Sequence, residues 1–234
     1  MTFPTIISYY TQGTGYEREV KNLIASCQKL NIPCQIDSIT SLGSWEENCC
    51  YKPRYILKKL DELSTPVLWV DADAVIVKRP TLFESMTADI ALRVVDNLPR
   101  NSPSKMISGT VYFNQTAAAK TILHEWAAEC QRMLEESQPE VWDQVALRNT
   151  LYQSNATIYP LSRAYYMIYD AMTTKCYDEA IIVHYQASRI FKKEINQLVV
   201  PFWSTEESSQ EARKAFCSTR VKRGDQDENR GGNS

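Results

Sequence analysis

Glycine is scarce in this sequence, with seven residues among 234, and three of them fall within the last eleven positions. The other four are too few and too scattered to form GxGxxG or GxxxxGK[ST]. These are the glycine-rich loops that bind phosphate in dinucleotide-binding and P-loop proteins. If this protein binds a phosphate, it therefore does so by another device.

The sequence also lacks an excess of either charge and any apolar run long enough to cross a membrane. Lysine and arginine number 26 and aspartate and glutamate 28, for a net charge of -2. We therefore expect no nucleic-acid-binding surface and no polybasic membrane patch. The mean hydropathy of -0.37 agrees with the absence of a transmembrane segment. The first five residues contain no lysine or arginine, which is atypical of a signal peptide.

Zinc-binding cysteine motifs are missing as well, although the chain has seven cysteines. No CxxC occurs, and Cys49 and Cys50 form the only close pair, so a zinc ribbon or finger is not expected. An odd number of irregularly spaced cysteines fits free thiols in a reducing compartment. This pattern predicts a cytoplasmic protein.

Strand-like and helix-like segments alternate along most of the chain. The run 5–10, the helical stripe from Tyr16 and the alternating segment 34–39 form a strand–helix–strand unit of the kind that makes parallel neighbours. We expect an α/β domain over residues 1–204, with a mostly parallel central sheet and helices on both faces. The polar composition of residues 205–234 predicts a disordered tail. The expected strands are 5–10, 34–39, 66–77, 90–95, 106–113, 157–159 and 180–183, the expected helices are 16–30, 53–63, 121–134 and 141–151, and 41–50 is a loop.

Two carboxylates interrupt the most apolar of these segments. Asp71 and Asp73 follow the run Val67–Val70, at the carboxyl end where open α/β sheets bind their ligands. In an extended segment residues i and i+2 point to the same side, so both carboxylates can reach one cation. A hard divalent ion with oxygen ligands is the partner that this pattern favours. The alternative is a pair of solvated aspartates in a turn.

One histidine is a further candidate ligand. His184 ends the predicted strand 180–183, and a neutral imidazole is a common metal ligand. A single histidine is more often a hydrogen-bonded polar residue without a metal, so its assignment depends on what lies near it.

An apolar strand that ends in DxD is found in two enzyme families. Asp71–Ala72–Asp73–Ala74–Val75 fits the first motif of haloacid-dehalogenase-like phosphatases, which are Mg²⁺-dependent phosphohydrolases. That motif normally lies on the first strand, whereas here a whole strand–helix–strand unit precedes it. The later acidic pair that holds Mg²⁺ in that family has no counterpart in this sequence.

The order of motifs resembles more closely the nucleotide-diphosphosugar transferases with the GT-A fold. The similarity extends over roughly residues 5–192 and includes the segment 45–56 with Lys52, the DxD strand, the strand 107–114 with Ser108–Gly109, the pair Asp143–Gln144 and the late His184. The chain departs from this pattern after His184, where Gly-x-x-Lys-Pro-Trp is replaced by Tyr185–Gln186–Ala187–Ser188–Arg189.

This resemblance implies a glycosyltransferase of the hexosyltransferase type. It would transfer a sugar from a nucleotide diphosphate, a UDP-sugar in our prediction, to a glycan, lipid or protein acceptor that the sequence does not identify. A protein that binds nucleotide sugars without turnover is the alternative outside enzymes. The implied cofactor is Mn²⁺ or Mg²⁺. The implied metal ligands are Asp71, Asp73 and His184; the donor-binding residues are Tyr9, Thr11, Lys52, Asp71, Gly109 and Thr110; and the catalytic residues are Asp143 and Gln144.

Several of these residues also have a purely structural interpretation. Lys52 could simply be solvated at a predicted helix start. The helix dipole disfavours a cation there, which favours the functional explanation, a contact with the donor diphosphate. Gly109 lies inside a strand and allows either close approach of a sugar ring or a plain bulge. Asp143 and Gln144 could equally belong to a surface helix with a salt bridge.

Overall fold

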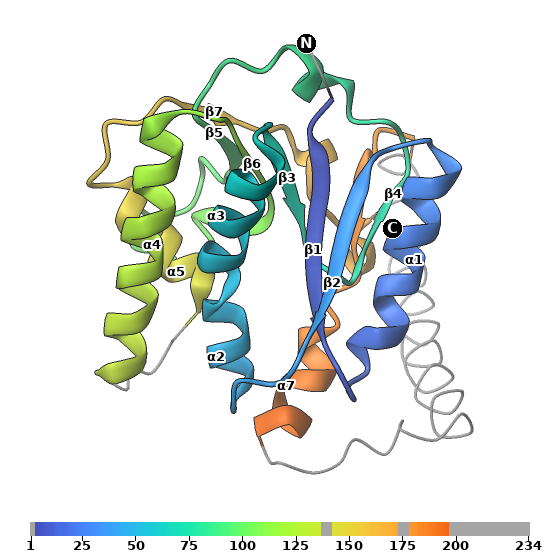
Figure 1. Ribbon diagram of the computed structural model, residues 1–234, viewed down its shortest axis with the longest axis horizontal. Helices are drawn as coiled ribbons and strands as arrows, with labels where there is room; N and C mark the ends of the chain where they lie inside the picture. The colour runs from blue at the N-terminus through green and yellow to red at the C-terminus, as the bar shows by residue number, and fades with distance from the viewer. Residues whose placement is uncertain (1–2, 137–141, 173–177, 197–234) are drawn as a thin grey trace, which may run out of the picture.

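The computed structural model describes residues 3–136, 142–172 and 178–196, and its centre is a six-stranded sheet (Figure 1). The strand order is β2-β1-β3-β6-β5-β7. β6 runs antiparallel to both of its neighbours, and the other five strands share one direction. The predicted α/β class and mostly parallel sheet are therefore confirmed. The strands are β1 (Thr5–Thr11), β2 (Cys34–Ile39), β3 (Val67–Val70), β5 (Ile90–Val94), β6 (Met106–Phe113) and β7 (Ile158–Pro160).

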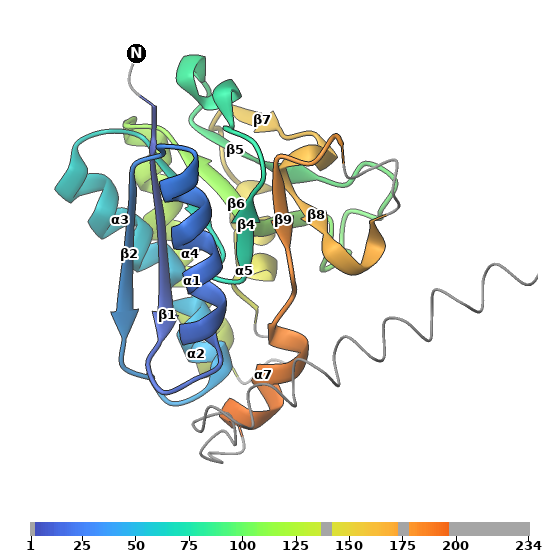
Figure 2. The same cartoon turned by 90° about the vertical axis from the view of Figure 1, so that its right-hand side faces the viewer.

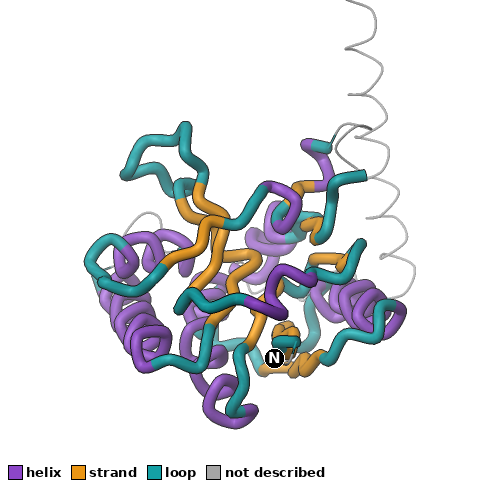
Figure 3. Tube along the Cα trace, turned by 90° about the horizontal axis from the view of Figure 1, so that it is seen from above, coloured by secondary structure: helices purple, strands orange, loops and turns teal. Residues whose placement is uncertain are grey.

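Helices cover both faces of this sheet (Figures 1 and 3). Because successive residues of a strand point to opposite faces, Ile6 of β1 packs with Leu23 in one core, and Ile7 packs with Ile56 in the other. All eight residues of β6 are buried, as expected for a strand with both faces covered. One face carries α1 (Tyr16–Lys29), and the other carries α2 (Trp45–Cys50), α3 (Lys52–Leu63), α4 (Ala117–Glu135) and α5 (Asp143–Leu151).

A second, smaller sheet lies beside the first in the order β4-β9-β8 (Figure 2). Its strands are β4 (Ala74–Ile76), β8 (Met167–Ile168) and β9 (Ile182–His184). The prediction of one strand over 66–77 is therefore wrong. The chain leaves the large sheet after Val70, turns at residues 71–73 and enters the small sheet at Ala74. The bond from the Ala74 N–H to the Asp71 carbonyl, at 3.0 Å, closes that turn.

Other boundaries also differ from the sequence-based expectation. The predicted loop 41–50 contains α2, whose capping box is formed by Ser44 and Glu47. α4 begins earlier than predicted because Thr116 accepts a hydrogen bond from the Ala119 N–H and caps it. The short strand near residue 180 is shifted to end on His184.

The remaining described elements are 3₁₀ turns and one helix. These are η1 (Thr81–Ser85), η2 (Arg163–Tyr165), η3 (Tyr169–Ala171) and α7 (Ser188–Asn196). Within the described ranges, no helix combines the length and the apolar composition that crossing a bilayer needs. The predicted tail over 205–234 lies outside the described residues.

Candidate active site

A cavity of about 700 Å³ opens at the carboxyl ends of β1 and β3. Its lining includes residues from β1, α2, α3, α5, β9 and α7, so segments far apart in the sequence meet here. Two of the predicted site residues, Gly109 and Thr110, do not line the cavity but contact residues that do. The Gly109 carbonyl accepts a hydrogen bond from the Asp71 N–H, and the Thr110 hydroxyl contacts His184. The predicted site residues that do line it are Tyr9, Thr11, Lys52, Asp71, Asp73, Asp143, Gln144 and His184.

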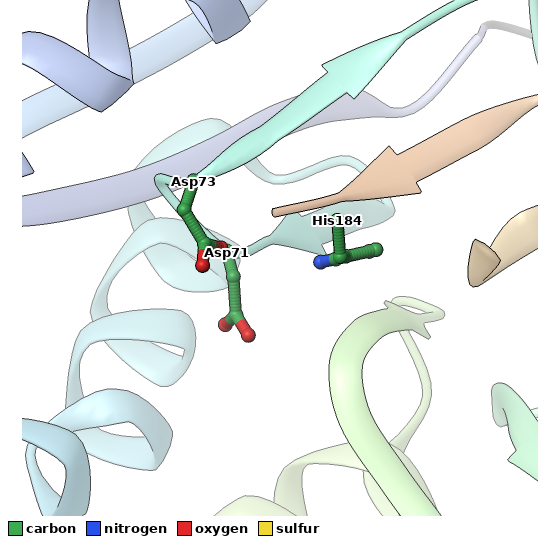
Figure 4. A group of neighbouring side chains, drawn as sticks. All are labelled: Asp71, Asp73 and His184. Atoms are coloured by element: carbon green, nitrogen blue, oxygen red, sulfur yellow. The ribbon is translucent and has the colours of Figure 1, made fainter. Parts of the chain in front are cut away.

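Asp71, Asp73 and His184 offer three ligand atoms within 4.8 Å of one another (Figure 4). The turn 71–73 brings the two carboxylates together, and the antiparallel pairing of Ala74 with His184 fixes the histidine beside them. Figure 4 shows the nitrogen-bearing side of the His184 ring facing the carboxylates. The two aspartates do share one side, but a turn rather than an extended strand places them there.

Burial shifts the pKa values of two members of this cluster, Asp73 and His184. Asp73 is 7% exposed, and burial together with the nearby charge of Asp71 raises its pKa to about 7. Its Oδ2 accepts a 2.6 Å hydrogen bond from the Ala187 N–H. Burial and the positive charge of Lys52 lower the pKa of His184 to about 3. The imidazole is therefore neutral and able to donate a lone pair to a cation.

Thr110 and Tyr166 hold His184 in place. The Thr110 Oγ1 lies 2.9 Å from the His184 Nε2, and the Tyr166 ring centroid lies 4.4 Å from that of His184. A Cβ at Gly109 would lie 2.4 Å from the Tyr166 ring and 3.0 Å from the Asp71 Oδ2. The structure thus gives Gly109 a packing role, and its predicted contact with a donor sugar stays a prediction.

Lys52 lies between two carboxylates. Its Nζ is 3.0 Å from the Asp71 Oδ1 and 2.7 Å from the Asp143 Oδ2. Burial by itself would lower the pKa of Lys52, but Asp143 and Asp71 outweigh that effect and raise the pKa above its ordinary value. The Trp69 indole donates a further 2.8 Å bond to the Asp71 Oδ1. Both contacts to Asp71 end on Oδ1, so within the described chain the other oxygen, Oδ2, is open to a ligand.

Asp143 and Gln144 start α5 and belong to the site rather than to a surface helix. Asp143 is buried, and its carbonyl accepts a 2.7 Å bond from the Trp126 indole. The Gln144 Oε1 accepts from the Ser108 N–H at 3.2 Å, and its Nε2 donates to the Pro103 carbonyl at 2.8 Å. The Gln144 side chain therefore ties the strand beside the cavity to the loop before it.

Of the two residues predicted on β1, Tyr9 forms part of an aromatic wall. Tyr9 packs against Tyr55 and Trp69 and donates a 2.5 Å bond to the Asn48 carbonyl. Thr11 is buried, and its carbonyl accepts from the Thr14 hydroxyl.

Several cavity residues were missed by sequence reasoning, namely Trp45, Arg93, Trp142, Arg163, Arg189 and Lys192. A clue existed for α7, because apolar residues at helical spacing follow His184. Arg93, Trp142 and Arg163 had no comparable signal. Two successive tyrosines differ in their surroundings, because Tyr166 lines the cavity, whereas Tyr165 is buried against Phe83 in the core.

The comparisons with known proteins agree with this geometry. The model of the nucleotide-diphospho-sugar transferase family matches residues 47–194. A glycosyltransferase involved in the glycosylation of the major capsid of PBCV-1 superposes with a TM-score of 0.60 at 15% identity, over 84% of this chain and 98% of that one. The apo glycosyltransferase GlyE of Streptococcus pneumoniae TIGR4 gives 0.52 at 14% identity, over 79% of this chain and 55% of that one. The apo bifunctional glycosyltransferase WbbM gives 0.51 at 12%, over 79% and 46%. Among curated proteins no match is found.

Proposed function

The chain belongs to the nucleotide-diphospho-sugar transferase family and has the GT-A fold, and from that premise we propose that it transfers a hexose from a UDP-sugar to an acceptor. We further propose that the reaction uses Mn²⁺ or Mg²⁺ held by Asp71, Asp73 and His184. The observation that carries this proposal is the placement of three ligand atoms within 4.8 Å at the edge of a large cavity.

The residues present fit such an ion. Two carboxylates and a neutral imidazole are a donor set that divalent cations accept. Asp71, Asp73 and Asp143 bring three carboxyl groups to the site, and Lys52 is the cation that lies against two of them. A divalent ion would favour the ionised form of the buried Asp73. When bound, the ion would neutralise charge on the departing diphosphate as a Lewis acid.

The other residues take roles that follow from their positions. The aromatic wall at Tyr9 suits the base and ribose of the donor, with Thr11 at its edge. Lys52 holds the Asp71 side chain in place through its 3.0 Å contact, and its charge lies close to the proposed diphosphate. Asp143 and Gln144 border the same cavity, where the catalytic role predicted for them would bring them near the sugar.

Calorimetry of UDP binding tests the metal proposal. With Mn²⁺ present, Asp71→Asn and Asp73→Asn should each weaken UDP binding by about tenfold or more, because a lost metal ligand costs at least as much as a lost supporting contact. The matched control is Asp61→Asn, which removes an exposed carboxylate paired with Lys120 and should leave UDP affinity unchanged. Unchanged affinity in both site variants would show that Asp71 and Asp73 hold no ion that contacts the nucleotide.

Turnover separates the proposed enzyme from its alternatives. Incubation with UDP-glucose or UDP-galactose and Mn²⁺ should release UDP, and EDTA should stop the release. Binding of UDP-sugars without any release would instead indicate a binding protein. Release of phosphate from simple phosphomonoesters would indicate a phosphohydrolase.

A further inference from the structure

Arg93 lines the cavity at an irregularity between β5 and β6. Leu92 pairs with Val111, but the next residue, Arg93, pairs with Ile107, so the register jumps past residues 108–110. Bulges of this kind redirect side chains next to functional sites. Arg93 and Ile107 face each other across the strand pair, and both line the cavity.

A second arginine lines the same end of the cavity. Arg163 lies in η2, three residues before the Tyr166 that packs on Gly109 and His184. We call this part of the cavity the arginine end, defined by Arg93, Val95, Ile107, Arg163 and Ile168. Its apolar members leave the two guanidinium groups as its main polar features.

In the described part of the chain neither arginine meets a carboxylate. Arg93 donates through Nη1 to the Leu161 carbonyl at 3.2 Å, and Arg163 donates through Nη2 to the Ala171 carbonyl at 3.3 Å. Each guanidinium has five N–H donors, so most of this capacity is unused by the described residues. The other cavity cations differ, because Lys52, Arg189 and Lys192 all pair with carboxylates.

The arginine end is separated from the proposed nucleotide site. In the sheet, β5 lies three strands from β1, through β3 and β6. At about 4.8 Å per strand this is roughly 14 Å, with Asp71 and Gly109 in between. A donor that stacks near Tyr9 and reaches the ion with its diphosphate would leave the arginine end beyond the transferred sugar.

We propose that the arginine end binds a negatively charged group, a carboxylate or a phosphate, on the acceptor sugar. This inference rests on the proposed function, because it needs the donor on the β1 side. A guanidinium fork matches both anions through paired N–H···O bonds, and such charge-assisted bonds are stronger than neutral ones. The two arginines would thus select an acidic acceptor over a neutral one of the same shape.

Ligand-observed NMR with glucuronate, glucose 6-phosphate and glucose as probes tests the proposal. The protein is loaded with UDP and Mg²⁺, which avoids the paramagnetism of Mn²⁺. At least one anionic probe should bind about tenfold more tightly than glucose, as expected for charge-assisted contacts. The double variant Arg93→Gln/Arg163→Gln should lose this preference. Arg54→Gln should keep it, because Arg54 lies outside the cavity and contacts Gln131 of α4.

The outcomes separate acceptor binding from donor binding. UDP affinity should stay within about twofold in the double variant, and the preferred anion should not displace UDP. Equal binding of all three probes, or a preference that survives the double variant, would overturn the proposal. Displacement of UDP by the anion, with weaker UDP binding in the double variant, would assign the arginines to the donor diphosphate instead. Repeating the titration without nucleotide keeps the test valid even if the wild-type protein binds no UDP, a result that would contradict the proposed function alone.

Discussion

Replacing Lys52 by methionine should destabilise the protein strongly, although the length and apolar stem of the side chain are kept. In the wild type the ammonium group is buried and touches the carboxylates of Asp71 and Asp143. Methionine would leave both carboxylates without that cation. The two carboxylates differ in how far water can reach them once the cation is lost, because the Asp143 side chain is 8% exposed and the Asp71 side chain is 34% exposed.

The magnitude follows from the cost of an uncompensated buried charge. Removing one partner of a buried ion pair destabilises by about 3–5 kcal/mol. In a chain of this length each kcal/mol lowers the melting temperature by about 2–4 °C, so the expected loss is about 6–20 °C. Asp143 should account for most of it, since water can solvate the carboxylate of Asp71.

Thermal unfolding in EDTA measures this effect without any cation to replace the ammonium group. The double variant Lys52→Met/Asp143→Asn should recover most of the lost stability, and Lys52→Met/Asp71→Asn should recover less. A single variant that melts within about 2 °C of the wild type would refute the reasoning. So would a better rescue by Asp71→Asn than by Asp143→Asn, because the more buried carboxylate would then not be the costly one.

Three further substitutions test individual contacts of the site and the core. Gly109→Ala should cost about 1–3 kcal/mol through overpacking against Tyr166, and adding Tyr166→Ala should restore part of the melting temperature. Thr110→Val removes the contact to the His184 Nε2 and should weaken Mn²⁺ binding, measured by calorimetry, by about 10–100-fold; an unchanged affinity would exclude a positioning role. Hydrogen bonds from Thr116 and Thr157 lower the pKa of Asp89, so the stabilisation they give is present at neutral pH and is lost as the pH falls through the folded-state pKa. Urea unfolding should therefore show a larger difference between the wild type and Asp89→Asn at pH 7 than at pH 3, and an equal difference at both would contradict this assignment.

The sequence predicted well those elements whose buried side recurs at a fixed period. In α1 the residues Val20, Leu23 and Cys27 mark one face of the helix, and all three are buried as expected. Periodicity gave the wrong boundary for residues 66–77, which were predicted as one strand. The residues of both strands, one in the large sheet and one in the small sheet, are largely buried, so the apolar pattern continues from one to the other. Hydropathy does not fall at the junction between two buried strands, so it carries no sign of the turn.

The sequence could indicate residues of the candidate site but not the contacts between them. The order of motifs brought forward Lys52, Asp71, Asp143 and His184, and the structure places all four around one cavity. It could not show that Lys52 pairs with a carboxylate 91 positions away, because that contact depends on how α3 and α5 pack. Arg93 lies at a register jump between β5 and β6, for which the local sequence holds no signal.

The turn at Asp71–Ala72–Asp73 has a consequence for the mechanics of the domain. The small sheet that begins after it consists of strands of two or three residues, and its β4–β9 pair joins segments more than 100 positions apart. Short strands of this kind open more readily than a long central sheet. A cation shared by Asp71, Asp73 and His184 would act as a cross-link between the two sheets and would slow amide exchange in β9. The exchange rate of a few backbone protons near His184 would then report occupancy of the site without any substrate being present.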